Sequence, residues 1–202
     1  MRLRSDPVRD GDPGMTSALI GRDHPLGLLR AAIGRAAAGR GGLVLVTGEA
    51  GIGKTALVTQ AAEEARRQGA LVLGGACWAA DGTPGYWPWV QVLRALRRAV
   101  APAEWAALVA SVGDGLPALL GEARGAAPAE AFRLHDAVTT ALVSAAQHRP
   151  VLVVLDDLHW ADAASLRLLE FAARHTWFER LLLVGAYWDA EVEAGDHPLR
   201  PP

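Results

Sequence analysis

The stretch Gly48-Glu49-Ala50-Gly51-Ile52-Gly53-Lys54-Thr55 decides which fold can be expected. It follows the apolar run Leu43-Val44-Leu45-Val46-Thr47, which is typical of a buried parallel strand, and it precedes a helical pattern over residues 55–68. The spacing G-x-x-x-x-G-K-S/T between a strand and a helix indicates a phosphate-binding loop. Its glycines let successive backbone N–H groups curl around one anion, and the helix adds the partial positive charge of its N-terminus.

Each polar residue of this loop has an expected task. Lys54 is expected to bridge the β- and γ-phosphates of ATP and to act in catalysis, and the Thr55 hydroxyl is expected to ligate Mg²⁺. Lys54 is the only lysine of the chain, because every other basic residue is arginine. An isolated lysine in such a background indicates a need for a compact ammonium. The residues predicted to contact the nucleotide are Gly48, Glu49, Ala50, Gly51, Ile52, Gly53, Lys54, Thr55 and Ala56.

Composition limits the class of protein. The chain has 202 residues, 51% of them hydrophobic, which is enough for one domain with a core. Its net charge of −2 gives no electrostatic reason to bind nucleic acid or an anionic membrane. Cys77 is the only cysteine, which fits a reducing cytoplasm. No apolar run is long enough for a membrane span, and the polar residues 1–17 are expected to form a mobile arm, not a secretion signal.

Strands and helices are predicted to alternate along the rest of the chain. Apolar runs typical of buried strands occupy residues 71–73, 151–155 and 181–186. Helical patterns cover residues 26–38, 90–100, 102–112, 129–147 and 162–174, and residues 113–128 are expected to be a surface connection. This alternation predicts one α/β domain over residues 18–202, a three-layer sandwich with a parallel sheet.

Two carboxylates follow directly on the predicted strand 151–155. Ligands gather at the carboxyl ends of parallel strands, so Asp156 and Asp157 are expected beside the phosphate loop. Asp156 is expected to contact Mg²⁺, and Asp157 to orient or deprotonate the attacking water. The alternative is that both are solvated turn residues before the next helix. His159 is expected to be structural, because the histidines show no metal-ligand spacing.

Trp78, Trp87 and Trp89 flank a predicted turn over residues 81–85. The simpler interpretation places them in a small part of the core, and the alternative is a surface for a partner.

The stretch Leu155-Asp156-Asp157-Leu158-His159-Trp160-Ala161-Asp162 resembles the Walker B motif of signal-transduction ATPases related to AAA proteins. It is most similar to the N-terminal ATPase module of large ATP-binding LuxR-type bacterial transcriptional regulators. Ile20-Gly21-Arg22-Asp23 resembles a motif that in this family lies near the adenine, which implies nucleotide contacts for Gly21 and Arg22. Tyr86-Trp87-Pro88-Trp89 resembles a further family segment. The resemblance implies an AAA-like P-loop NTPase fold, with strand 181–186 lying between strands 43–47 and 151–155.

Two features depart from this family. Trp188 stands where the family usually has an arginine that senses the γ-phosphate. The sequence also ends at Pro202, without the helical lid, winged helix, repeats and C-terminal helix-turn-helix of family members. We therefore expect a regulatory module that binds Mg·ATP, hydrolyses it slowly as a weak ATPase, and binds ATP and ADP with similar affinity. A regulatory protein or a second copy is an expected partner, whereas direct contact with nucleic acid or a membrane is not expected.

Three alternatives remain from the sequence. The first is a truncated nucleotide-binding or interaction module without useful ATPase activity. The second is a small P-loop kinase, against which the Trp-Ala-Asp sequence argues. The third is a DNA-loading AAA ATPase of the origin-recognition type, which would need the missing lid and winged helix.

Overall fold

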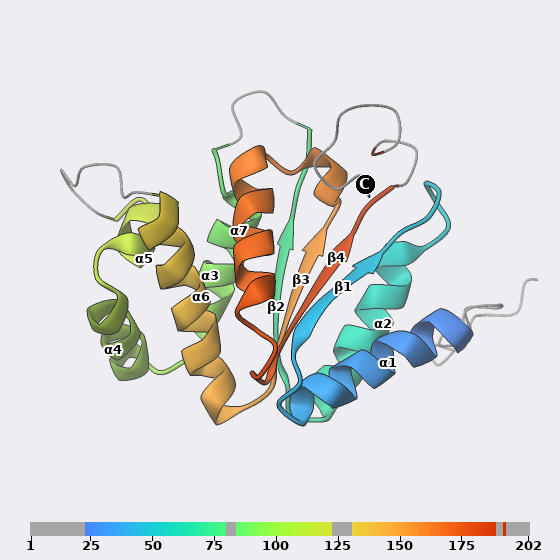
Figure 1. Cartoon of the computed structure of the whole chain (residues 1–202), viewed down its shortest axis with the longest axis horizontal. Helices are drawn as coiled ribbons and strands as arrows, with labels where there is room; N and C mark the ends of the chain where they lie inside the picture. Colours follow the sequence, from blue (N-terminus) through green and yellow to red (C-terminus); the bar gives the residue numbers. More distant parts are fainter. Residues whose placement is uncertain (1–22, 80–83, 123–130, 189–191, 193–202) are drawn as a thin grey trace, which may run out of the picture.

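A parallel sheet of four strands forms the centre of the molecule (Figure 1). The computed structural model describes residues 23–79, 84–122, 131–188 and 192. The strand order is β1-β4-β3-β2, so the parallel sheet and the expected place of the fourth strand between the first and third are confirmed. The strands are β1 (Gly42–Val46), β2 (Leu71–Ala76), β3 (Val151–Asp156) and β4 (Leu181–Ala186).

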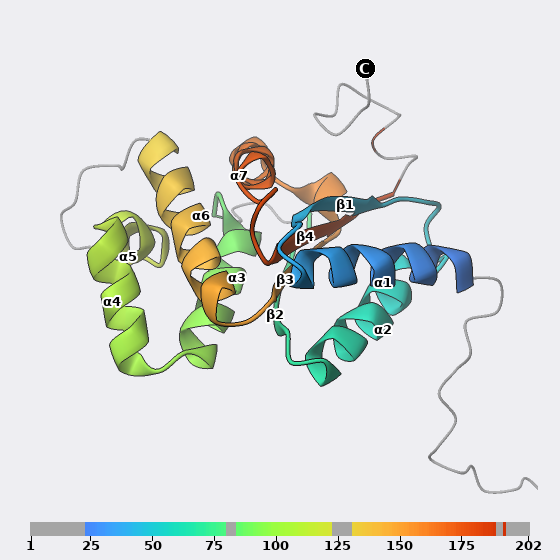
Figure 2. The same ribbon diagram turned by 60° about the horizontal axis from the view of Figure 1, so that its bottom comes forward.

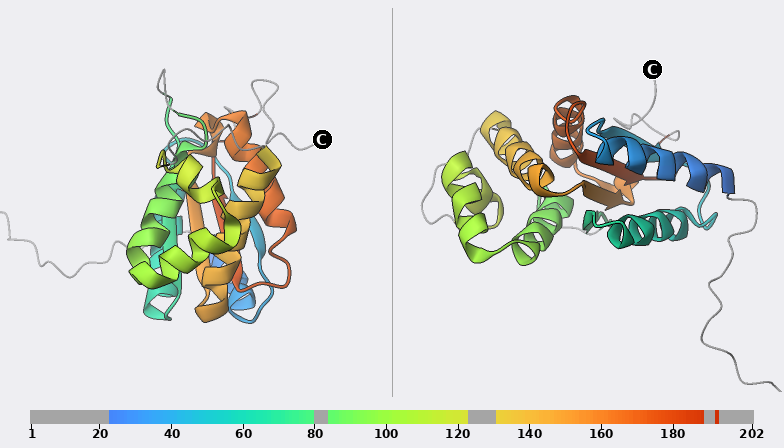
Figure 3. Two further views of the ribbon diagram at one scale, coloured as in Figure 1. Left: turned by 90° about the vertical axis from the view of Figure 1, so that its left-hand side faces the viewer. Right: turned by 90° about the horizontal axis from the view of Figure 1, so that it is seen from below.

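Helices cover both faces of this sheet and make three layers (Figures 2 and 3). One face carries α1 (Asp23–Ala37) and α2 (Lys54–Arg67). The other carries α3 (Trp87–Ala99), α6 (Ala131–His148) and α7 (Ala163–Arg174). Outside α6 lie α4 (Pro102–Val112) and α5 (Gly115–Leu119), which contact α6 and each other.

The apolar strands supply both faces of the core. Successive side chains of a strand point to opposite faces, so Leu152 and Val184 pack under α1 and α2, whereas Val153 and Leu183 pack under the opposite helices. All four are buried. Burial of one such side chain contributes about 1.5–3 kcal/mol. Within the described residues, no helix is both long and apolar enough to cross a membrane.

The prediction of a surface connection over residues 113–128 was wrong for its first part. Residues 115–119 form α5, and the side chain of Leu116 is completely buried. Gly115 lies so close to α6 that a Cβ atom on it would come 2.7 Å from the Cβ of Ala137. Small residues on both elements allow this approach, which the Gly- and Pro-rich sequence did not indicate. Residues 123–130 lie outside the described part of the chain.

The tryptophans divide between core and surface. Trp89 is fully buried, which confirms the core interpretation for this residue. Trp78 is 46% exposed, and its ring meets that of Trp87 edge-to-face at a centroid distance of 5.8 Å. A partner surface at Trp78 stays a prediction.

Candidate nucleotide-binding site

Glycines give the loop between β1 and α2 its shape. Gly48, Gly51 and Gly53 have φ angles of 144°, 74° and 86°. Residues with a Cβ atom enter the left-handed helical region at a cost of about 1–2 kcal/mol, so these positions favour glycine. Gly53 is also the N-cap of α2 and has no side chain to cap its first turn. A helix start of this kind suits an anion, because the helix dipole is positive there.

Lys54 lies against this loop. Its side chain is only 8% exposed, and Nζ donates hydrogen bonds of 2.8 Å to the carbonyl oxygens of Gly48 and Glu49. An ammonium carries three N–H donors, so one remains for a phosphate oxygen. The fold therefore keeps the only lysine at the loop instead of extending it into solvent. Of the other predicted contacts, Glu49, Ala50, Gly51, Ile52 and Ala56 are exposed along the loop and the start of α2.

Thr55 and Asp156 meet at the carboxyl end of the sheet. The Thr55 hydroxyl donates a 2.9 Å hydrogen bond to Oδ2 of Asp156. Oδ1 of Asp156 accepts a 3.0 Å hydrogen bond from the backbone N–H of Asp157. A hydroxyl and a carboxylate are oxygen ligands that Mg²⁺ prefers, and this ion is usually held by one or two protein oxygens together with substrate phosphates.

The composition of the site fits that mode of binding. In the part of the chain that the structure describes, no group of three or more His, Cys, Asp or Glu residues could hold a metal ion. A Mg²⁺ ion at Thr55 and Asp156 would thus take its remaining ligands from phosphates and water.

Asp157 occupies an unusual backbone conformation directly after β3. Its φ of 55° is left-handed, and it caps the short helix η1 (Leu158–Trp160). Burial, and then the neighbouring charge of Asp156, raise the pKa of Asp157, whereas His159 and Lys54 act in the opposite direction. A raised pKa makes a carboxylate a better proton acceptor near neutral pH. The role of Asp157 toward water stays a prediction.

The turn after β3 is fixed from below by close packing. The Leu158 side chain is 1% exposed and lies against Gly185 of β4. A Cβ atom on Gly185 would overlap that side chain, so a glycine is required there.

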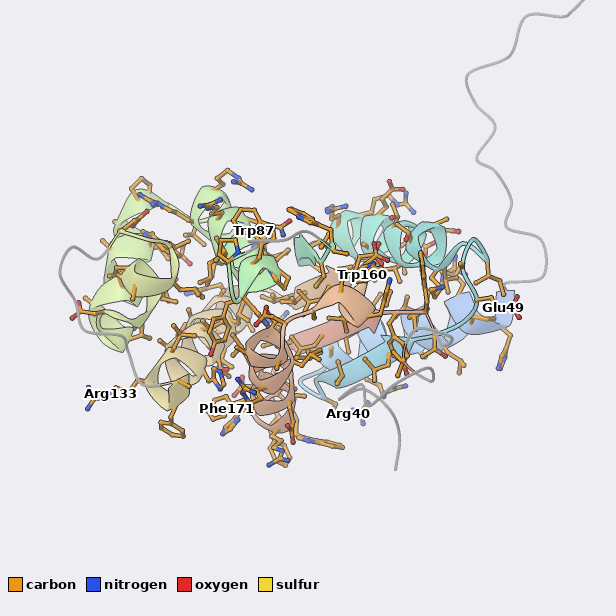
Figure 4. The ribbon with its side chains drawn as sticks, turned by 90° about the horizontal axis from the view of Figure 1, so that it is seen from above. Arg40, Glu49, Trp87, Arg133, Trp160 and Phe171 are labelled. Carbon is orange, nitrogen blue, oxygen red and sulfur yellow. The ribbon has the colours of Figure 1, made fainter. Side chains whose placement is uncertain are left out.

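Trp188 packs on the same turn. Its ring stacks on the imidazole of His159, with centroids 4.5 Å apart and planes 23° apart. His159 is buried and also contacts the ring of Trp160, which is 43% exposed. Figure 4 shows Trp160 and the loop residue Glu49 in a view onto this end of the sheet. Gly21 and Arg22 lie outside the described residues.

Sequence reasoning missed the part that Asp162 plays. This residue is the N-cap of α7, where Oδ1 accepts hydrogen bonds from the N–H groups of Ala164 and Ser165. Oδ2 accepts from the Ser165 hydroxyl at 2.5 Å and from the N–H of Tyr86 at 3.1 Å. An aspartate directly before a helical pattern was the available signal for the cap, but nothing local indicated the contact with Tyr86.

Tyr86 is the second residue with a left-handed backbone. Its φ is 63°, which costs about 1–2 kcal/mol in a residue with a side chain. Its hydroxyl lies 3.1 Å from Nε2 of His135. Burial raises the pKa of Tyr86, and burial together with the charge of Arg167 lowers that of His135.

The largest cavity lies away from the predicted site. It has a volume of about 730 Å³ and is lined by residues of α1, β1 and α7, among which no predicted site residue occurs. A smaller cavity of about 160 Å³ touches both Thr55 and Asp156.

A parallel sheet with this strand order and a glycine-rich strand-to-helix loop define a P-loop NTPase fold. Residues 18–184 match the family model described as "AAA ATPase domain", and the chain belongs to this family.

Two solved structures illustrate how distant other similarities are. One is Drosophila ORC bound to GC-rich DNA and Cdc6, with 12% identity over 92% of this chain and 56% of that chain, and a TM-score of 0.38. The other is the ATPase domain of a helicase, with 14% identity over 79% and 61%, and a TM-score of 0.32. This chain thus spans less than two thirds of either. A search of curated proteins found no significant match.

Proposed function

We propose that this chain binds Mg·ATP at its phosphate loop and hydrolyses it slowly, as the conformational switch of a LuxR-type bacterial transcriptional regulator. The observation that carries the nucleotide site is the hydrogen bond between Thr55 and Asp156, next to the buried ammonium of Lys54. It brings a hydroxyl, a carboxylate and the end of a glycine loop to one place. Membership of the AAA ATPase domain family supports the same chemistry.

Each residue has a proposed task in this site. Residues Gly48 to Ala56 surround the phosphates, and Lys54 neutralises the charge that develops between the β- and γ-phosphates. Thr55 and Asp156 hold the metal, which supplies further charge neutralisation when bound. Asp157 orients the attacking water and takes its proton.

The regulatory part of the proposal rests on the resemblance of residues 155–162 to the Walker B motif of the LuxR-type group. It places Gly21 and Arg22 at the adenine, and it treats residues 1–17 as an arm before one ATPase domain over residues 18–202. The natural partners are ATP, ADP and a regulatory protein or second copy, in the cytoplasm.

The second candidate is a nucleotide-binding module without useful catalysis. The stacking of Trp188 on His159 favours it, because an indole carries no charge with which to sense a γ-phosphate. Equilibrium binding of ATP and ADP, together with single-turnover hydrolysis of radiolabelled ATP, separates the candidates. Magnesium-dependent binding with slow turnover supports the switch. Binding without any turnover supports the second candidate, and no binding excludes both.

A further inference from the structure

Two stretches of sequence far apart in the chain are joined at the phosphate end of the sheet. The segment that begins α3 contains Tyr86, and the turn that follows β3 ends at Asp162. The N–H of Tyr86 donates to Oδ2 of Asp162 across 76 positions of sequence. A second bond runs nearby, in which the indole N–H of Trp89 donates to the carbonyl oxygen of Ser165 at 3.0 Å.

The carboxylate of Asp162 is fully used. It accepts from the N–H groups of Ala164, Ser165 and Tyr86 and from the hydroxyl of Ser165, so two donors reach each oxygen. Only an ionised carboxylate can accept at both oxygens, because an amide in its place presents N–H donors on one side. The helix cap alone needs one oxygen, so the second oxygen is available for the contact with Tyr86.

Asp162 also ends the turn that carries Asp157. Within that turn, the N–H of Trp160 donates to the carbonyl of Asp157, and the N–H of Ala161 donates to that of Leu158. Asp157 has the left-handed backbone at the other end. Fixing Asp162 therefore fixes the turn from the side opposite the phosphate loop.

Tyr86 is held in a conformation that it would not adopt freely. A φ of 63° in a residue with a side chain persists only where its surroundings determine it. The bonds to Asp162 and to His135 provide those surroundings, from α7 and from α6.

From this geometry we infer that Asp162 is a positioning residue for ATP hydrolysis. Its carboxylate ties the segment around Tyr86 to the turn that carries Asp157, so that a shift of this segment displaces Asp157. The inference rests on the proposed function, because Asp157 has no reaction to support without it. Asp162 itself contacts neither nucleotide nor metal in this proposal.

The test compares Asp162→Asn with Ser165→Ala in the full chain. The amide can still cap α7 through its oxygen but opposes the N–H of Tyr86. Ser165→Ala removes one hydrogen bond from the same carboxylate and leaves the Tyr86 contact. Asp162→Asn is expected to lower kcat about tenfold, because misplacing a catalytic group by a fraction of an ångström costs this much. The affinity for Mg·ATP should stay within about twofold in both variants, and kcat should be unchanged in Ser165→Ala.

Equal losses in the two variants, or a loss confined to nucleotide affinity, would overturn the inference. Asp162→Ser serves if the amide variant does not fold, since serine is a good N-cap with a single oxygen. It is expected to show the same loss of kcat at unchanged affinity.

Amide hydrogen exchange keeps this result separate from the proposed function. In Asp162→Asn, the amides of Tyr86 and of residues 157–161 are expected to exchange faster together, whereas Ser165→Ala leaves both groups unchanged. If the chain does not hydrolyse ATP, the proposed function fails, and this joint acceleration still supports the structural tie. Acceleration confined to Ala164 and Ser165 would contradict the tie.

Discussion

The hydroxyl of Thr55 donates a 2.9 Å hydrogen bond to Asp156, although 101 positions separate the two residues in sequence. Thr55 lies in the first turn of α2, and Asp156 ends β3, two strands away from the strand that leads into α2. Because all strands are parallel, their carboxyl ends share one edge of the sheet, and residues that follow different strands meet there.

The first prediction concerns magnesium at this pair. Asp156→Ala is expected to keep part of the affinity for ATP and to lose its dependence on magnesium, because one of two protein oxygens near the metal is removed. Titration of ATP with and without magnesium measures this. Thr55→Ser is the control, since it retains a hydroxyl and should keep the dependence. An affinity of Asp156→Ala that still rises with magnesium would count against the metal site.

The second prediction concerns Lys54. Lys54→Ala should weaken ATP binding by about 1.5–3 kcal/mol or more, the size of a charged hydrogen bond, while the domain stays folded. Lys54→Arg should not restore the affinity, because a flat guanidinium replaces a compact ammonium in a tight loop. Calorimetric titration with Mg·ATP and a circular dichroism spectrum provide both readings. Unchanged affinity in Lys54→Ala would exclude the assigned site.

The third prediction uses the raised pKa of Asp157. The folded state resists ionisation of this group, so its charge costs stability at any pH above the raised pKa, and this cost disappears below 3.8, where both states are protonated. Asp157→Asn should therefore raise Tm at pH 7 and lower ATP turnover, with the gain in Tm shrinking as the pH falls toward 3.8. Asparagine tolerates the left-handed backbone, so the change isolates the charge.

Glu64 offers a control of opposite sign for that experiment. A hydrogen bond from Arg30 lowers the pKa of Glu64 below its ordinary value of 4.5, so its charge stabilises the folded state above that pH and the stabilisation is lost in acid. Glu64→Gln should lower Tm at pH 7. A fall in Tm for Asp157→Asn as well would show that the cost of burying its charge was misjudged.

The fourth prediction concerns Trp188. Trp188→Arg is expected to raise single-turnover hydrolysis about tenfold, which is less than a well-placed catalytic arginine contributes. It should also make the chain bind ATP more tightly than ADP. Trp188→Phe keeps an aromatic ring against His159 without a charge and should change neither property. Fast hydrolysis by the native chain, or no gain with arginine, would exclude the loss of a sensor as the reason for slow turnover.

The fifth prediction concerns two adjacent glycines in β2. A Cβ atom on Gly75 would collide with the backbone carbonyl of Pro88, whereas one on Gly74 would meet nothing within 4 Å. Gly75→Ala should destabilise the chain by about 1–3 kcal/mol, the cost of overpacking, and Gly74→Ala should leave it at least as stable. Urea unfolding of both variants measures the difference, and equal stabilities would contradict the close approach of α3 to β2.

Features carried by contiguous residues could be predicted from the sequence. The strand β4 was predicted at its observed bounds, because six apolar residues between turns leave few alternatives. The loop at residues 48–55 was equally clear, because its glycines and Lys54 are adjacent in the chain. The strand order was different, since no residue pattern of this chain encodes it and only the resemblance implied it.

Contacts between distant segments were not predictable in this way. The burial of Leu116 depends on small residues of α6, and the contact between Tyr86 and Asp162 depends on how α3 and α7 are packed. The left-handed backbone of Tyr86 went against local preference, because a tyrosine rarely adopts it unless other residues hold it there. Such features follow from tertiary packing and leave no local pattern.

The contact between Leu158 and Gly185 divides the site into an anchored half and a pliable half. Leu158 fills the space above β4, so the acidic turn is seated in close-packed interior, where displacement would open the sheet. The opposite half depends on Gly48, Gly51 and Gly53, whose backbone rotates without steric cost. When a nucleotide arrives, the loop should mould itself to the phosphates, while the carboxylates serve as the fixed reference against which it closes.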